Sequence, residues 1–345
     1  MTGPHRQARR KTAAAREGGP PPLDGGCAVL LDQLAADARV IGWSEGVHLR
    51  SEYLIARNAA VRHLVERHGV RAIAAETNFE LSRPSDAYIR GLGPAEPTPA
   101  AVRGMWSWSR EPLADNRALL RWLRHHNTAR APAEQVRFYG LEMYGTPTGE
   151  PPATPAPTTL HDPAVRGDLA DLRHAGRLRR LLREHRAAGG DHRDTVVRDS
   201  AQYLTMREIA RRHPDSPIFL FEQVEHLDRR VPGSLGEHLA RGGLGRFRVV
   251  GAVWRDGDPT VRYPLGRYRE LSRRLHDLTE AGPTGGTTPL LVGPTGPTVF
   301  DLRPWRSAGL GTPPVRRLDT PLTDAATAFD AVLYTPALHA ATVLA

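Results

Sequence analysis

Short apolar runs alternate with long helical patterns along this chain, and this alternation restricts its fold more than any other feature. The runs are rich in Val, Ile, Phe and Tyr, which favour strands, whereas the segments between them place apolar residues at helical spacing. The pattern is typical of an α/β fold, in which helices flank a mostly parallel sheet. The predicted strands cover 39–44, 71–76, 136–142, 217–222, 246–254, 288–292 and 329–335. The predicted helices begin near residues 27, 48, 84, 112, 162, 194, 233 and 264.

Two parts of the chain depart from this alternation. Residues 1–26 carry a basic stretch followed by Gly-Gly-Pro-Pro-Pro, in place of the apolar region that a secretion signal needs. We predict that they form a disordered basic tail on a cytoplasmic protein, and that residues 27–345 form one domain. Within this domain, a loop rich in Gly, Pro and Thr at 145–161 precedes an arginine-rich helical segment at about 162–213. We interpret that segment as a helical insertion or lid.

Composition excludes several kinds of partner. The formal charge is +9, but the arginines lie among acidic residues and no basic stripe alternates with aromatics, so we predict no nucleic-acid partner. No apolar run approaches the roughly 20 residues of a membrane span, and we predict no membrane association. Cys27 is the only cysteine, which excludes an intrachain disulfide and a thiolate metal cluster.

The most informative polar residues lie where the predicted strand 39–44 gives way to a helix. Glu45 precedes His48 by three residues, and a carboxylate at this spacing can orient an imidazole and raise its basicity, which suits general-base catalysis on water. Glu76 ends the next predicted strand. Parallel strands deliver their carboxyl ends to one edge of a sheet, so we predict that Glu45, His48 and Glu76 share a site. The alternative is a structural cap, with His48 hydrogen-bonded in the interior.

Other catalytic motifs are missing from the sequence. No Gly-x-Ser-x-Gly motif is present, and a phosphate-binding loop needs a lysine, whereas the only lysine, Lys11, lies in the tail. The spacing of the other histidines is poor for metal ligation, as in His125-His126 beside Arg124. We therefore predict neither a metal ion nor a cofactor.

Two longer motifs, at 44–57 and 73–79, resemble the erythromycin esterase family. Later segments, such as the one that holds Trp106 and Trp108, resemble its middle and carboxy-terminal parts less specifically, so that the resemblance covers roughly 38–340. The resemblance implies an α/β fold with an added helical part. It also implies hydrolysis of a macrolide lactone by an activated water, without a covalent serine intermediate.

The resemblance assigns roles to individual residues. It implies that His48 is the general base, that Glu45 orients it, and that Glu76 positions water or a second histidine. Arg57 would hold the substrate or stabilise developing negative charge. However, Arg57 lies nine residues after His48, which is two and a half helical turns. Either the helix starts after His48, or Arg57 is a buried ion-pair partner, for example of Glu76.

This sequence departs from the family at one functionally important motif. The family carries His-Asn-x-His after a later strand, whereas residues 222–226 here read Glu-Gln-Val-Glu-His. We predict that His226 is catalytic and that Gln223, which stands in place of the first histidine, binds substrate. Because a glutamine cannot shuttle a proton near neutral pH, either Glu222 or Glu225 takes over that role or the reaction differs.

Two aromatic residues complete the predicted site, and one further residue departs from the family pattern. Trp106 and Trp108 either line an apolar substrate cleft or pack in the core, which is the commoner use of such residues. Leu49 stands where many family members have glycine.

These observations lead to one functional prediction and two alternatives. We expect an erythromycin esterase-like hydrolase that acts on an ester or lactone of a bulky natural product, in antibiotic resistance or in secondary metabolite biosynthesis. The first alternative is a biosynthetic tailoring enzyme that uses the same groups for elimination, cyclisation or acyl transfer. The second is a protein that binds macrolide-like molecules without turning them over. In each case the expected partner is a small molecule.

Overall fold

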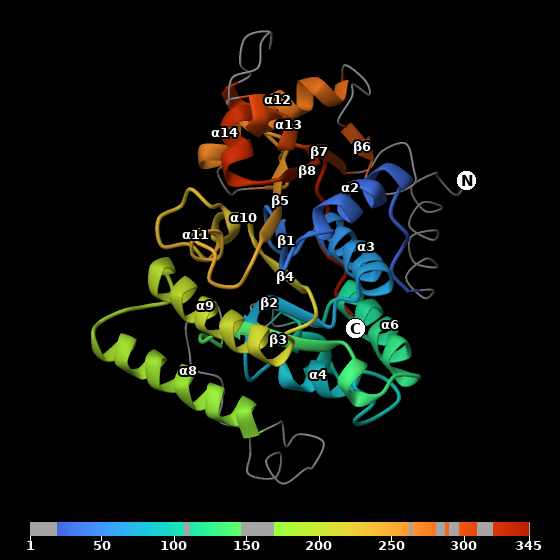
Figure 1. The fold of residues 1–345 in the computed structure, drawn as a ribbon, viewed down its shortest axis with the longest axis vertical. Helices are drawn as coiled ribbons and strands as arrows, with labels where there is room; N and C mark the ends of the chain where they lie inside the picture. Colours follow the sequence, from blue (N-terminus) through green and yellow to red (C-terminus); the bar gives the residue numbers. More distant parts are fainter. Residues whose placement is uncertain are drawn as a thin grey trace.

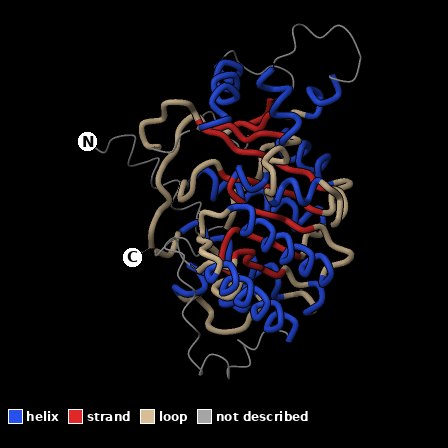
Figure 2. The backbone as a smooth tube through the Cα atoms, turned by 90° about the vertical axis from the view of Figure 1, so that its left-hand side faces the viewer, coloured by secondary structure: helices blue, strands red, loops and turns tan. Residues whose placement is uncertain are grey.

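A single mixed sheet runs through the protein. The computed structural model describes residues 19–106, 111–145, 169–261, 265–280, 287–289, 297–308 and 320–344. Within these residues the sheet has eight strands in the order β3-β2-β4-β1-β5-β8-β7-β6, stacked along the long axis of the molecule (Figure 2). The strands are β1 (Val40–Glu45), β2 (Ala72–Asn78), β3 (Arg137–Glu142), β4 (Ile218–Gln223), β5 (Phe247–Trp254), β6 (Thr287–Pro289), β7 (Thr298–Asp301) and β8 (Ala331–Thr335).

The first six strands of this order are parallel to one another. Strand β7 pairs antiparallel with β8, and β6 pairs antiparallel with β7. The predicted α/β fold with a mostly parallel sheet is therefore confirmed. The central strands are buried along their whole length, as is usual for strands covered by helices on both faces. The sequence did not reveal β7, and the predicted strand at 288–292 corresponds to β6, although residues 290–292 lie outside the described ranges.

Helices cover both faces of the sheet. In Figure 1, α2, α3 and α6 lie on one side, and α9, α10 and α11 lie on the other. No helix in the described ranges combines the length and the apolar character that crossing a bilayer requires. The α-helices are α2 (Gly25–Ala35), α3 (Ser51–His68), α4 (Arg83–Ile89), α5 (Pro99–Gly104), α6 (Ala114–Thr128), α8 (Leu169–Ala187), α9 (Thr195–Arg212), α10 (Val224–Leu227), α11 (Leu235–Ala240), α12 (Arg269–Glu280), α13 (Arg303–Ala308) and α14 (Thr320–Ala328).

The amino-terminal boundary of the ordered domain lies earlier than expected. Helix α2 begins at Gly25, inside the segment predicted as a tail, because the Asp24 side chain caps it by accepting a hydrogen bond from the Gly26 amide at 2.9 Å. Its apolar face then packs on α3. Residues 1–18 of the predicted tail lie outside the described ranges.

The predicted helical insertion divides into two different parts. Helix α9 packs directly on β3 and α11, so that it belongs to the layer that covers the sheet. Helix α8 packs on α9 and lies further from the strands (Figure 1). The segment therefore supplies the crossover from β3 to β4, which a parallel sheet requires, in addition to an outer helix. Residues 162–168 lie outside the described ranges.

Candidate active site

Four adjacent strands each carry a buried glutamate near the carboxyl edge of the sheet. In the order of the strands, these are Glu142 on β3, Glu76 on β2, Glu222 on β4 and Glu45 on β1, and we call them the glutamate row. Strand pairing fixes their alignment, since Ser44 lies opposite Glu222 across β1 and β4. Burying four carboxylates is unfavourable unless cations or protons compensate them. The side chains that supply these cations and protons, together with the glutamates, make up the site.

The first compensating group is His48, in the turn between β1 and α3. Its Nδ1 lies 2.7 Å from Glu45 Oε1, which leaves Nε2 as the nitrogen available to a reacting molecule. Burial lowers the pKa of His48, but the Glu45 carboxylate and then Glu76 outweigh this effect and raise the pKa to about 8. The Trp106 ring lies 4.7 Å from the imidazole ring, centroid to centroid. His48 is therefore a strengthened base with its side chain still 38% exposed.

A second histidine is held in the same way. His226 Nδ1 lies 2.6 Å from Asp199 Oδ1, and the other Asp199 oxygen accepts a hydrogen bond from the Leu235 amide at 2.8 Å. His226 Nε2 lies 3.8 Å from Glu76 Oε1. Burial lowers the pKa of His226, but Asp199 and Glu76 raise it by more. Two imidazoles, each fixed through Nδ1 by a carboxylate, thus lie on either side of Glu76.

Arg198 of α9 is the cation at the other end of the glutamate row. Its guanidinium hydrogen-bonds Glu142 and lies 3.2 Å from Glu76 Oε1. Gln202, one turn later, donates to Glu142 Oε1 at 2.7 Å. Burial raises the pKa of Glu76, but His48, His226 and Arg198 together lower it below its ordinary value. Glu76 is therefore ionised, and it is the carboxylate that links the two histidines.

Glu222 differs from the other members of the glutamate row because a bound proton, and not a nearby cation, offsets the cost of burying it. It is fully buried, and its carboxyl group hydrogen-bonds that of Glu76. Burial, followed by the charges of Glu76 and Glu142, raises its pKa well above the ordinary value. Glu222 is consequently a neutral carboxylic acid. Glu225, the other acid considered from the sequence, is exposed.

Arg57 occupies a different position from the one that a substrate-binding role suggests. Helix α3 begins at Ser51, so the alternative in which the helix starts after His48 is the one observed. The Arg57 guanidinium is buried, donates to the side chains of Asn58 and Asn116, and forms no ion pair with Glu76. Burial lowers its pKa to about 10, although the nearby Glu45 charge opposes this effect. It lies over the Phe221 ring of β4 and does not line the cavity described next.

A cavity of about 580 Å³ opens above the carboxyl edge of the sheet. This volume lies in the range of small-molecule sites. Gln223 lines the cavity, and its backbone N–H donates to Glu76 Oε2 at 3.2 Å. Trp108 lies outside the described ranges. The cavity is lined by His48, Leu49, Glu76, Trp106, His192, Arg193, Thr195, Arg198, Asp199, Gln223, Glu225, His226, Val231, Pro232 and Ser234.

Leu49, at the mouth of this cavity, has a strained backbone. Its φ is 61°, the only positive φ among the described residues other than glycine. The left-handed conformation costs a side chain with a Cβ roughly 1–2 kcal/mol. Glycine adopts this conformation without strain, and here the conformation places an exposed leucine side chain against the cavity.

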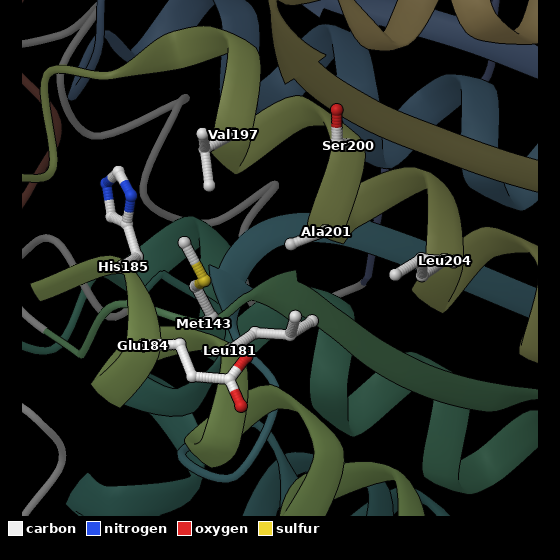
Figure 3. Close-up of a pocket in the computed structure, with 8 residues that line it drawn as sticks. All are labelled: Met143, Leu181, Glu184, His185, Val197, Ser200, Ala201 and Leu204. Atoms are coloured by element: carbon white, nitrogen blue, oxygen red, sulfur yellow. The ribbon is translucent and has the colours of Figure 1, made fainter. Parts of the chain in front are cut away.

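A smaller cavity of about 270 Å³ lies between α8 and α9. Figure 3 shows Leu181, Glu184 and His185 of one helix facing Val197 and Leu204 of the other. Its lining is mostly apolar and includes none of the paired histidines or the glutamate row, so the acid-base chemistry belongs to the larger cavity.

The donor atoms of the site also fit a divalent cation in composition. Glu45, His48 and Glu76 place one ligand atom each within 4.8 Å of one another, and so do Glu76, Glu222 and His226. Carboxylate oxygens and imidazole nitrogens are ordinary ligands of Zn²⁺ and Mn²⁺. The same groups need no ion for proton transfer, because each imidazole has a carboxylate partner and Glu222 holds a proton.

Asp199 and Arg198 are the functional groups that sequence reasoning missed. Nothing in the spacing of the two residues along the chain connects them with Glu76 or His226. Their roles depend on the packing of α9 on β3.

The fold and the site define an α/β protein with two histidine–carboxylate pairs at the carboxyl edge of its sheet. The model of the erythromycin esterase family matches residues 65–156, which include Glu76, Trp106 and Glu142. The resemblance to this family recognised in the sequence is therefore confirmed. His48 and His226 lie outside the matched segment.

Solved structures share the fold over most of the chain. A protein from Bacillus cereus has a TM-score of 0.56 and 13% identity, over 92% of each chain. A mutant of the erythromycin esterase EreC in its open conformation has a TM-score of 0.51 and 17% identity, over 90% of this chain and 94% of that one. A succinoglycan biosynthesis protein has a TM-score of 0.55 and 12% identity, over 91% and 92%.

Proposed function

We propose that this protein is a hydrolase of the erythromycin esterase kind, and that it cleaves an ester or lactone of a bulky, largely apolar natural product. The observation that carries the proposal is the contact between Glu45 and His48 Nδ1 at 2.7 Å, beside a cavity of about 580 Å³. A base of this strength, open to a cavity of this size, suits the activation of water against an acyl carbon. Leu49 and Trp106 supply apolar surface for the substrate.

The proposed reaction begins with water between His48 and the substrate carbonyl. The water proton passes to His48 Nε2 while the water oxygen bonds to the acyl carbon and forms a tetrahedral intermediate. The carbon–oxygen bond of the ester then breaks, and the leaving alkoxide takes a proton. His226 is the proposed donor of that proton, because Asp199 fixes its Nδ1 and its pKa is raised. The products are a carboxylic acid and an alcohol.

Gln223 is compatible with this scheme, although it cannot transfer a proton. Its backbone N–H already donates to Glu76, and the residue lines the cavity, where its side chain can bind a substrate oxygen. A histidine at position 223 could supply a proton. Here we propose that Glu222, which directly precedes Gln223 in β4, supplies it instead. In the proposed scheme His226 regains its proton from Glu222 through Glu76, and the proton that His48 took from water then passes by the same route to Glu222, so that every group returns to its starting state.

A tailoring enzyme remains the second candidate because of the same Glu222. A neutral carboxylic acid beside an ionised carboxylate and two basic imidazoles can also serve proton abstraction and return, as in an elimination or a cyclisation. Such a reaction would change the substrate without adding water. The product mass therefore separates the two candidates.

The test is mass spectrometry of a panel of macrolides and other lactones incubated with the protein in ¹⁸O-labelled water. Hydrolysis adds one labelled water, and His48→Asn should slow it by roughly 10²–10⁴-fold. The matched control is His125→Asn, which changes an exposed histidine on α6 and should keep the wild-type rate. Loss of water or isomerisation would favour the tailoring enzyme, and binding that survives His48→Asn, with no product even from the wild type, would refute both enzymes.

A further inference from the structure

A second group of metal-binding side chains lies far from the active site, between α2 and α3. Asp32 of α2 faces His63 and His68 of α3. His68 ends α3, whereas the candidate active site adjoins its beginning at Ser51. Seventeen helical steps separate the two ends, which is roughly 25 Å. Events at this cluster can therefore be measured separately from catalysis.

The geometry of the cluster is that of converging ligands. His63 Nε2 lies 2.7 Å and His68 Nε2 lies 2.6 Å from the same atom, Asp32 Oδ1. Two ligands of a tetrahedral ion, each about 2.1 Å from it, are roughly 3.4 Å apart. Each Nε2 thus needs to move from Asp32 Oδ1 by less than about 1 Å to accept an ion between them.

We propose that Asp32, His63 and His68 bind one Zn²⁺ ion that links α2 to α3. Two imidazole nitrogens and one carboxylate oxygen match the ligand preference of Zn²⁺. The His63 and His68 side chains are only 15% and 20% exposed, so that they are already oriented, whereas Asp32 is 37% exposed and open to solvent. Water from that side completes the coordination. On binding, each Nε2 donates its lone pair, and the ring proton resides on Nδ1.

The surrounding charges permit a cation at this place. Arg62, which precedes His63, is paired with Glu66 at 3.2 Å, and its NH1 group donates to the Pro20 carbonyl. These contacts direct it away from Asp32, which is therefore free to offer its charge to an ion. Because the ion binds the folded arrangement of α2 on α3, it should stabilise the amino-terminal part of the domain by mass action.

The test is calorimetric titration of chelator-treated protein with Zn²⁺ alone, accompanied by thermal melting. The wild type should bind one ion at the cluster and melt at a higher temperature in its presence. Asp32→Asn, His63→Gln and His68→Gln should each weaken this binding by about tenfold or more and abolish the thermal shift. Each variant should retain cooperative unfolding and the wild-type hydrolytic rate, since none of these residues belongs to the catalytic site.

Two control variants decide where the ion binds. His125→Gln removes an exposed histidine outside any cluster and should leave binding unchanged. His48→Gln disrupts the ligand group in the active site and should also leave it unchanged. Binding that is lost in His48→Gln but retained in the three cluster variants would overturn the proposal, and so would the absence of saturable binding by the wild type.

Discussion

The acid side of the pH–rate profile should be controlled by Glu45. His48 acts as a base only in its neutral form, and its pKa is raised from an ordinary value of 6.5 to about 8. At pH 7 roughly one molecule in ten then has a neutral His48. The wild-type kcat/KM should therefore rise with pH and reach half of its limit near pH 8.

Glu45→Gln should shift this acid limb to lower pH. The substitution keeps the shape of the side chain but removes the charge that does most to raise the pKa of His48, while burial still lowers it. The midpoint should fall by about one pH unit or more, toward the ordinary histidine value. The maximal rate of the profile should be lower than in the wild type, because an amide fixes the imidazole tautomer less firmly than a carboxylate does.

The assay is the initial rate of lactone or ester hydrolysis from about pH 5 to about pH 10, with kcat/KM fitted to two ionisations, the acid limb belonging to His48 and the basic limb to His226. Glu52→Gln is the matched control, since Glu52 lies in the same segment but contacts His339 instead of the site. It should leave the midpoint near pH 8. An unchanged midpoint in Glu45→Gln would refute the reasoning, because the titrating group would then be insensitive to the Glu45 charge.

Three further predictions concern stability and are measured by urea unfolding. Leu49→Gly should raise the free energy of unfolding by up to about 1 kcal/mol, because relief of the left-handed backbone exceeds the entropy that glycine loses, whereas Leu49→Ala keeps the strain and should not. Arg198→Met leaves Glu76 and Glu142 without their cation and should cost roughly 3–5 kcal/mol; a smaller loss than that of an exposed arginine would contradict the ion network. Glu222→Gln should stabilise the protein at pH 7, since the folded state keeps a proton that the unfolded chain releases, and the gain should vanish as the pH falls below 4.5. A loss of stability at pH 7 would show that Glu222 is ionised.

The sequence predicted those parts of the site that follow from strand ends. Glu45, His48 and Glu76 come directly after apolar runs, and the parallel arrangement of those runs brings them to one edge. The position of Arg57 depended on the residue at which α3 begins, which the sequence left open. Strand β7 has only four residues and pairs antiparallel with β8, so it lacks the long apolar pattern of the parallel strands.

The two residues that α9 contributes to the site could not be predicted, for a different reason. Arg198 and Asp199 lie more than a hundred residues after Glu76, and helical periodicity alone does not say which face of α9 meets the sheet. Their contacts arise only when α9 packs on β3. The compensation of the glutamate row is thus a property of tertiary packing, whereas the row itself follows from the strands.

The place of β4 in the sheet has a consequence for synthesis of the chain. Strand β4 lies between β1 and β2, although more than a hundred residues of chain separate it from both. During translation, β1 and β2 therefore emerge long before the strand that joins them. A nascent chain that ends before Ile218 has a gap in the middle of its sheet, with two apolar strand edges exposed to unwanted pairing. Ribosome-bound chains should accordingly gain protease resistance abruptly, once β4 has left the exit tunnel.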